Sequence, residues 1–197
     1  MSFKYLLDRI KSEAFLDSPF KHLELNNFFI PKHFEAIIGS DQVKIPGAKN
    51  DIELIQILED TGYKSIYFPG TTQNLKDYLN WHSGRGTHKN LEICEGFGMT
   101  FRLMDLRCNF LMEMNEFFQS AEFINCLAEK FDISLEETYP DYGLQKYLDG
   151  YEISPHPDIR KKALTYMINV NPNPRAHELD HHTHYMTFNK EHAFIQE

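Results

Sequence analysis

Two residues in the C-terminal part of the chain carry side chains that bind transition metals. His156 and Asp158 lie two positions apart, so in a β-strand both side chains project from the same face. An imidazole beside a carboxylate supplies two of the three ligands of the facial triad that holds non-haem Fe(II) and leaves coordination positions open. Pro155 and Pro157 bracket the histidine and lack backbone N–H groups, which suits a strand end or edge. The pattern predicts a metal site, and the alternative is a pair of surface polar residues in a proline-rich turn.

The segments on either side of this pair have the character of strands. Residues 147–153 indicate a strand, a turn at Gly150 and a second strand. Residues 163–170 (ALTYMINV) form a mostly apolar run, which predicts a buried strand. A strand, a turn, the metal-binding pair, a charged loop and a buried strand follow one another as in the first part of a double-stranded β-helix.

This region resembles the 2-oxoglutarate- and Fe(II)-dependent dioxygenases, in particular their prolyl-4-hydroxylase-like branch. That branch carries a recurring pattern of glycines, one tyrosine, the His-x-Asp pair and a Lys-x-Leu-Thr run. The matching positions in this chain are Gly143, Tyr147, Gly150, His156, Asp158, Lys162, Leu164, Thr165 and Asn171.

The resemblance implies an α+β chain built around a double-stranded β-helix (jelly-roll or cupin-like) barrel, with N-terminal helices packed on the outer face of its larger sheet. It implies hydroxylation of a C–H bond, with Fe(II) and 2-oxoglutarate as cofactors and with His156 and Asp158 as iron ligands. Tyr147 matches a family tyrosine that hydrogen-bonds the co-substrate, and is alternatively an aromatic side chain of the barrel. Asn169 occupies a strand position where many relatives carry a tyrosine, and is the second co-substrate contact that the resemblance implies.

The family also needs a distal histidine and a basic residue for the far carboxylate of 2-oxoglutarate. Both lie well downstream in the family, whereas the chain after Asp158 has room for two or three strands at ~5–6 residues each. The favoured explanation is that the sequence is an incomplete, inactive form that stops before the distal histidine. The alternative is a complete chain with an altered fold, in which His182, His184 or His192 is the third ligand.

A dense group of histidines follows the predicted barrel strands, at His177, His181, His182 and His184. In a strand, His182 and His184 share one face and His181 lies on the other. Three interpretations remain open: a second metal site, since imidazole suits iron, zinc, copper and nickel, a histidine-rich surface strand beside the active site, or a loop without chemistry.

Composition limits the partners and the compartment. The chain has 197 residues, with 42% apolar and 25% charged residues and a net charge of −9, so we expect a globular protein whose main partner is neither nucleic acid nor a membrane. The substrate is then a small molecule or a peptide. Cys94, Cys108 and Cys126 are odd in number and widely spaced, which indicates free thiols in a reducing compartment. With no signal-peptide pattern at the N-terminus, we expect the cytoplasm.

Apolar periodicity, together with residues that start or end helices and strands, predicts the remaining elements. Helices are expected at 1–16, 33–38, 51–61, 75–81 and 109–131, and strands at 21–29, 63–68 and 99–105. The long run at 109–131 is expected to break into two helices, with Ser120 as the N-cap of the second. Residues 83–90 (SGRGTHKN) lack the order of a phosphate-binding loop and are expected to form a flexible loop.

We expect a single domain over 1–197, with N-terminal helices and strands at 1–108, supporting helices at 109–131, and the first part of the barrel at 139–197. Unpaired strand edges favour association with a second copy, so we expect a homo-oligomer. Two alternative functions remain: a metal-free binding or assembly module on a β-helix scaffold, and a cupin-like metalloprotein that uses the histidine cluster.

Overall fold

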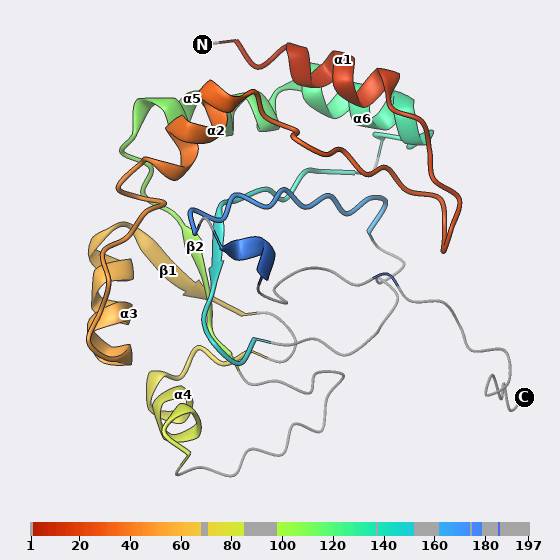
Figure 1. Ribbon diagram of the computed structural model, residues 1–197. Coiled ribbons are helices and arrows are strands. Elements are labelled where there is room, and N and C mark those ends of the chain that lie inside the picture. The colour runs from red at the N-terminus through yellow and green to blue at the C-terminus, as the bar shows by residue number, and fades with distance from the viewer. Residues whose placement is uncertain are drawn as a thin grey trace, which may run out of the picture.

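The computed structural model describes residues 2–67, 71–84, 98–136, 138–151, 162–173, 175–178 and 185. Within these residues the chain is α+β, with helices and a small antiparallel sheet (Figure 1). The elements are α1 (Tyr5–Ser12), α2 (Pro31–Ile38), α3 (Asp51–Asp60), β1 (Tyr63–Ile66), α4 (Leu75–His82), β2 (Thr100–Leu103), α5 (Asn109–Gln119), α6 (Ala121–Phe131), β3 (Gln145–Tyr147) and the 3₁₀ helix η1 (Ala176–Glu178).

Local sequence fixes where several helices begin. The side chain of Asn50 accepts a hydrogen bond from the Glu53 N–H at 3.0 Å and so caps α3, and Asn74 caps α4 in the same way. The Ser120 hydroxyl accepts from the Phe123 N–H at 3.2 Å and caps α6. Such caps satisfy backbone donors that have no partner within the helix. The predicted break of 109–131 into two helices at Ser120 is confirmed.

The three strands pair in the order β1-β2-β3, antiparallel throughout. Because side chains alternate across a strand, one face of the sheet carries Tyr63, Phe101 and Leu103, all buried. The other face, which we call the polar face, carries Lys64 and Ile66 from β1, Thr100 and Arg102 from β2, and Gln145 and Tyr147 from β3.

The helices and the apolar face of the sheet share one hydrophobic core. In this core α1 packs on α6, α2 packs on α5, and α3 packs beside β1 (Figure 1). The largest fully buried side chains come from both helices and strands: Leu6, Ile37, Leu58, Tyr63, Tyr78, Phe101, Leu111, Phe118 and Phe123. Burial of this apolar area is the main favourable term in folding. None of the described helices is long and apolar enough to cross a bilayer.

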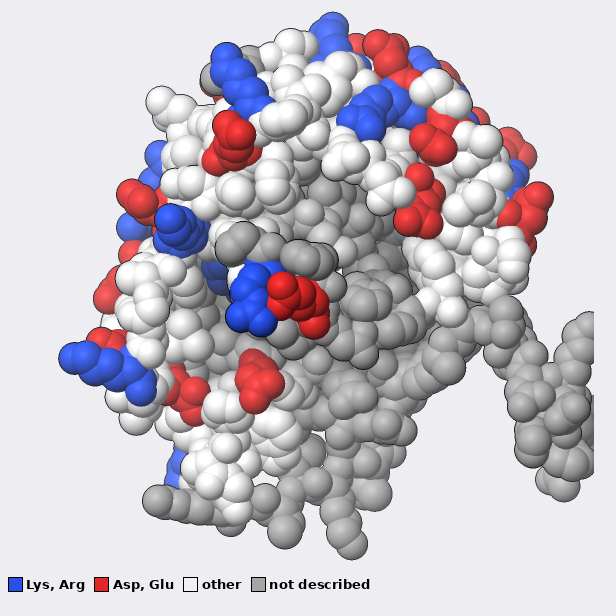
Figure 2. Space-filling view, in the orientation of Figure 1, with Lys and Arg blue, Asp and Glu red and all other residues white. Residues whose placement is uncertain are grey.

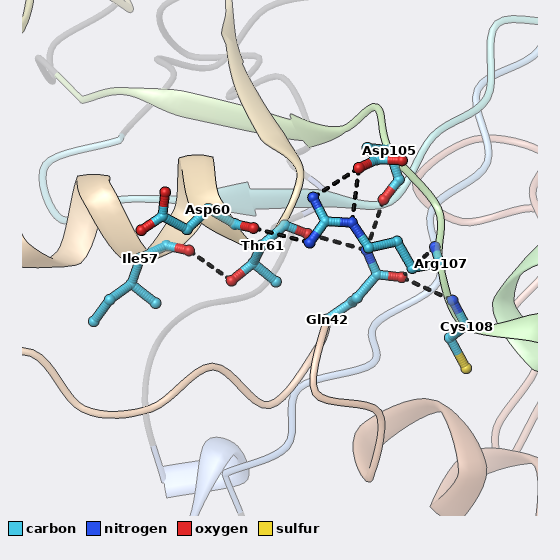
Figure 3. Close-up of polar contacts among 7 residues, drawn as sticks. All are labelled: Gln42, Ile57, Asp60, Thr61, Asp105, Arg107 and Cys108. Atoms are coloured by element: carbon cyan, nitrogen blue, oxygen red, sulfur yellow. Dashed lines mark hydrogen bonds and ion pairs between the residues drawn. The ribbon is translucent and has the colours of Figure 1, made fainter.

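A buried amide joins three elements at one end of the sheet (Figure 3). The Nε2 of Gln42 donates to the carbonyl oxygens of Thr61 at 3.0 Å and Asp105 at 2.7 Å. Its Oε1 accepts from the backbone N–H groups of Arg107 at 2.8 Å and Cys108 at 3.1 Å. The side chain therefore fixes the end of α3, the end of β2 and the start of α5 relative to one another.

The strand predicted at 21–29 is wrong. Its only backbone pairing within the described residues is a single antiparallel bridge at His22. The guanidinium of Arg9 on α1 donates to the backbone carbonyl oxygens of Asn26 at 2.9 Å and Phe28 at 3.2 Å. A side chain therefore satisfies backbone acceptors that a neighbouring strand would use, and the segment lies along α1 without entering the sheet.

A closed barrel is not seen in the part of the chain that the structure describes, because a sheet of three strands is open at both edges. The buried strand predicted at 163–170 is also not formed as such. The segment is irregular and exposure alternates along it, with Tyr166 and Ile168 half-buried and Met167 and Asn169 exposed. Tyr166 and Ile168 pack against the core, so the segment covers the core with one side only.

Candidate functional site

The predicted iron ligands His156 and Asp158 lie outside the described residues, as do the weaker candidates His182 and His184. Within the described ranges, no group of three or more histidine, cysteine, aspartate or glutamate side chains is arranged to hold a metal ion. Of the predicted site residues, the candidate co-substrate contacts Tyr147 and Asn169 lie in the described part of the chain and can be placed.

Tyr147 ends β3 on the polar face of the sheet. Its ring stacks on that of Tyr151 with centroids 4.3 Å apart and an interplanar angle of 30°. Its hydroxyl donates to Oε1 of Gln145 at 2.7 Å. Burial raises the pKa of the Tyr147 hydroxyl, and the charge of Arg102 opposes this rise. The hydroxyl is thus a neutral hydrogen-bond donor at neutral pH.

Asn169 is exposed in the irregular segment 162–173. Tyr166, three residues earlier, points the other way and meets Phe123 of α6 edge-to-face, with centroids 5.8 Å apart. No contact joins Asn169 to Tyr147 within the described residues, so the structure does not bring the two predicted co-substrate residues together.

The polar face also holds two polar atoms that sequence reasoning did not single out. Thr100 is fully buried, and its Oγ1 has no hydrogen-bond partner among the described residues. Arg102, on the same face two residues later, donates from its terminal nitrogens to the Asp141 carboxylate at 2.8 and 3.2 Å. Its Nε is buried and likewise has no partner in the described part. The alternation of Thr-Phe-Arg-Leu in β2 is the sequence pattern that places these two side chains together.

Glycine at position 143 makes room for this arrangement. A Cβ built on Gly143 would lie 2.8 Å from Cδ and 3.0 Å from Nε of Arg102. Any other residue would therefore displace the arginine stem, and the chain from Asp141 to Gly143 crosses directly over it. Gly143 is one of the positions that match the dioxygenase pattern. In this structure a glycine is needed there because the side chain of Arg102 packs against it.

A second polar cluster joins α3, α4 and the turn after β3. The Nδ1 of His82 lies 2.6 Å from Oδ2 of Asp51, and its Nε2 lies 2.9 Å from Oδ2 of Asp149. The imidazole stacks on the ring of Tyr78, with centroids 5.4 Å apart and an interplanar angle of 11°. The hydrogen bonds to Asp51 and then Asp149 raise the pKa of His82. This bridge holds the turn at Asp149 that leads into the segment with His156 and Asp158.

The His82 bridge predicts a pH-dependent contribution to stability. Because the pKa of His82 is raised above its ordinary value of 6.5, the contribution is fully present below that pH and is lost as pH rises through the folded-state pKa. We expect the free energy of unfolding of wild type to exceed that of a His82→Gln variant by about 1 kcal/mol at low pH and by less at higher pH. Urea unfolding of both proteins at pH 6 and pH 9 measures the difference.

Comparing the two proteins at each pH removes the effect of other titrating groups. His33 is buried, and burial lowers its pKa. Its contribution to stability therefore increases as pH rises, in both proteins alike. An equal difference between wild type and His82→Gln at the two pH values would contradict the charged bridge.

Lys146 of β3 lies on the apolar face and belongs to the scaffold. Its Nζ donates to the carbonyl oxygen of Val43 at 2.7 Å and lies 5.7 Å from the centre of the Tyr63 ring. Burial lowers the pKa of the Lys146 ammonium. Since this side chain points away from the polar face, it does not contribute to the candidate site.

Charge is mixed over the described surface. In Figure 2 basic and acidic side chains alternate on the face in view, without an extended patch of one sign among the described residues.

No protein-family model matches the chain, and neither a curated protein nor a solved structure matches it significantly.

Proposed function

We propose that the chain belongs to an Fe(II)- and 2-oxoglutarate-dependent oxygenase that hydroxylates a C–H bond of a small molecule or a peptide. His156 and Asp158 are two of the iron ligands in this proposal, and His182 and His184 are weaker candidates for a further one. The three-stranded sheet and the segment 162–173 form part of a double-stranded β-helix. The edges of this sheet, which pair with no further strand among the described residues, favour a homo-oligomer, and the free thiols of Cys108 and Cys126 favour the cytoplasm.

The polar face of the sheet is the observation that supports this proposal. It brings together the hydroxyl of Tyr147, the buried Oγ1 of Thr100 and the buried Nε of Arg102, the last two without partners among the described residues. Buried polar atoms without partners cost free energy, and a bound ligand or ordered water commonly satisfies them. In the chain, β3 and the turn at Gly150 lead directly from this face to His156.

The donor set fits the proposed groups. Imidazole and carboxylate ligands with open positions suit Fe(II), and hydroxyl and guanidinium donors suit the oxygen atoms of an organic acid. When bound, iron with 2-oxoglutarate and oxygen supplies the oxidising chemistry, which belongs to the cofactor. Tyr147 is the candidate hydrogen-bonding residue for the co-substrate, with its hydroxyl turned from Gln145 to the ligand, and Asn169 is a second candidate contact.

Metal analysis of purified protein with single substitutions tests the proposal. We expect wild type to bind Fe(II) and His156→Ala to bind it more than about 100-fold more weakly, because loss of even an outer-shell partner costs about 10–100-fold. The Asp158→Ala variant should behave in the same way. Succinate formation from 2-oxoglutarate is a second readout.

Two other results would contradict the proposal and identify the alternatives. Metal that is retained in His156→Ala but lost on changing His182 and His184 indicates a cupin-like site in the histidine cluster. No metal uptake by wild type at all indicates a metal-free binding module on the same scaffold.

A further inference from the structure

The imidazole of His82 lies between two carboxylates that come from different parts of the chain. Its Nδ1 is 2.6 Å from Oδ2 of Asp51, the first residue of α3, and its Nε2 is 2.9 Å from Oδ2 of Asp149, in the turn after β3. An ionised carboxylate only accepts hydrogen bonds, and an imidazole carries an N–H at both nitrogens only when it is protonated. Both contacts can therefore be hydrogen bonds only in the imidazolium form.

Loss of the proton leaves one ring nitrogen with a lone pair directed at a carboxylate, so one of the two contacts must open. The side chain of Asp51 is 30% exposed and belongs to a helix that is capped by Asn50 and packed into the core through Leu58. The side chain of Asp149 is 78% exposed and lies in a turn, so water solvates it when it leaves. We therefore expect the neutral imidazole to keep its Nδ1–H on Asp51 and to release Asp149.

We propose that His82 is a proton-controlled latch, which holds the turn at 149–151 against α4 when protonated and releases it when neutral. The N–H of Leu148 donates to the carbonyl oxygen of Met99 at 2.9 Å, so the end of β3 stays on the sheet in both states. Movement is then confined to the turn, whose last residue stacks its ring on Tyr147 of β3. The latch links the protonation of one histidine to the stacking of a tyrosine on the polar face.

The groups around the imidazole set the pH at which the latch opens. Among the described residues, the charged groups that act on His82 are Asp51 and Asp149, and hydrogen bonds to Asp51 and then Asp149 raise its pKa above the ordinary value of 6.5. From α4 itself, the rings of Tyr78 and Trp81 stack on the imidazole. Burial raises the pKa of the Tyr78 hydroxyl, so this group stays uncharged. The latch is thus closed below pH 6.5 and opens as pH rises through the folded-state pKa of His82.

The latch does not depend on the proposed iron site, because every group in it lies in the described part of the chain. It acts on one turn while the rest of the fold stays closed, which is a local opening and not global unfolding. Failure of the latch would leave the proposed function untouched, and absence of iron binding would leave the latch untouched.

Asp149→Asn is the decisive variant. The asparagine amide can accept a hydrogen bond from the Nε2–H of the imidazolium or donate one to the bare Nε2 of the neutral imidazole, so the turn should stay attached at every pH. Because the Asp149 side chain is exposed, we expect the variant to fold. Asp77→Asn is the matched control, since it removes an exposed carboxylate of α4 that does not act on His82.

Two measurements on the full chain between pH 5.5 and pH 9 test the latch. The first is an NMR titration of the His82 ring. The second is hydrogen exchange of the Tyr151 amide, which donates to the carbonyl oxygen of Leu148 at 3.2 Å across the turn, corrected for the intrinsic pH dependence of exchange. In wild type and Asp77→Asn we expect the ring to titrate above pH 6.5. Protection of the amide should fall about fivefold with the same midpoint, the size expected for one partly exposed ion pair. In Asp149→Asn the protection should not change with pH.

An equal pH dependence of the Tyr151 amide in wild type and Asp149→Asn would overturn the latch. A His82 ring that titrates without any change in amide exchange would overturn it as well. A ring that titrates at or below pH 6.5 would show that the two carboxylates do not hold the imidazolium, and the latch would again be wrong.

Discussion

Replacing Phe118 with alanine is expected to lower the free energy of unfolding by about 3–5 kcal/mol, the range for phenylalanine truncation in a packed core. Phe118 is 1% exposed. Its ring stacks on Tyr142 with centroids 5.0 Å apart and meets Phe123 edge-to-face at 4.9 Å. The side chain thus joins α5, α6 and the segment before β3, and its loss leaves a cavity that these three elements cannot all close.

Urea unfolding of purified variants measures this loss. Tyr139→Ala is the matched control, since Tyr139 is an aromatic residue that is 88% exposed, and it should change stability by no more than about 0.5 kcal/mol. A loss of less than about 1 kcal/mol in Phe118→Ala would mean that this core is loosely packed.

The same substitution should loosen the chain that follows the proposed iron ligands. Tyr166 packs against Phe123, and Phe123 packs against Phe118. Backbone amides in 162–173 are therefore expected to exchange faster with solvent in Phe118→Ala than in Tyr139→Ala, because local opening follows local packing. Unchanged exchange would show that the segment is held by other contacts.

Replacing Gln42 with alanine is expected to cost about 2–4 kcal/mol, because it leaves two part-buried carbonyl groups and two backbone N–H groups without their partners. Gln42 is 6% exposed, so water replaces the lost hydrogen bonds poorly. Gln56→Ala is the matched control, since the amide of that exposed glutamine bonds only to Asp60 on the next turn of α3. Chemical denaturation of the two variants measures the difference.

Gln42→Glu separates hydrogen bonding from size. Glutamate keeps the acceptor for Arg107 and Cys108 but sets a second oxygen against the carbonyl groups of Thr61 and Asp105. We expect it to be at least as destabilising as alanine at pH 7.5 and less so at pH 5, where a protonated carboxyl can donate to one carbonyl. If Gln42→Glu is as stable as wild type at pH 7.5, Gln42 does not donate to these carbonyls.

Local sequence patterns determined much of the secondary structure. The apolar periodicity of 109–131 and the capping geometry at Ser120 are both set within a few residues, so the two helices α5 and α6 could be predicted. The strands β1 and β2 were also expected from the sequence, although burial does not alternate along them, since Thr100 of β2 is as fully buried as Phe101. The strand expected at 21–29 failed because its carbonyl groups bond to Arg9, which lies on α1 and is distant in sequence.

The candidate functional residues were likewise found partly from the sequence and partly from the structure. The spacing alone identified His156 and Asp158 as candidate metal ligands, because residues two positions apart in a strand project from the same face. The pairing of β2 with β3 determined that Thr100 and Arg102 share a face with Tyr147, and the fold alone brought His82 between Asp51 and Asp149. Periodicity reports only on neighbours along the chain, whereas register, burial and the absence of a hydrogen-bond partner depend on groups far apart in sequence, which is why only the tertiary structure could decide them.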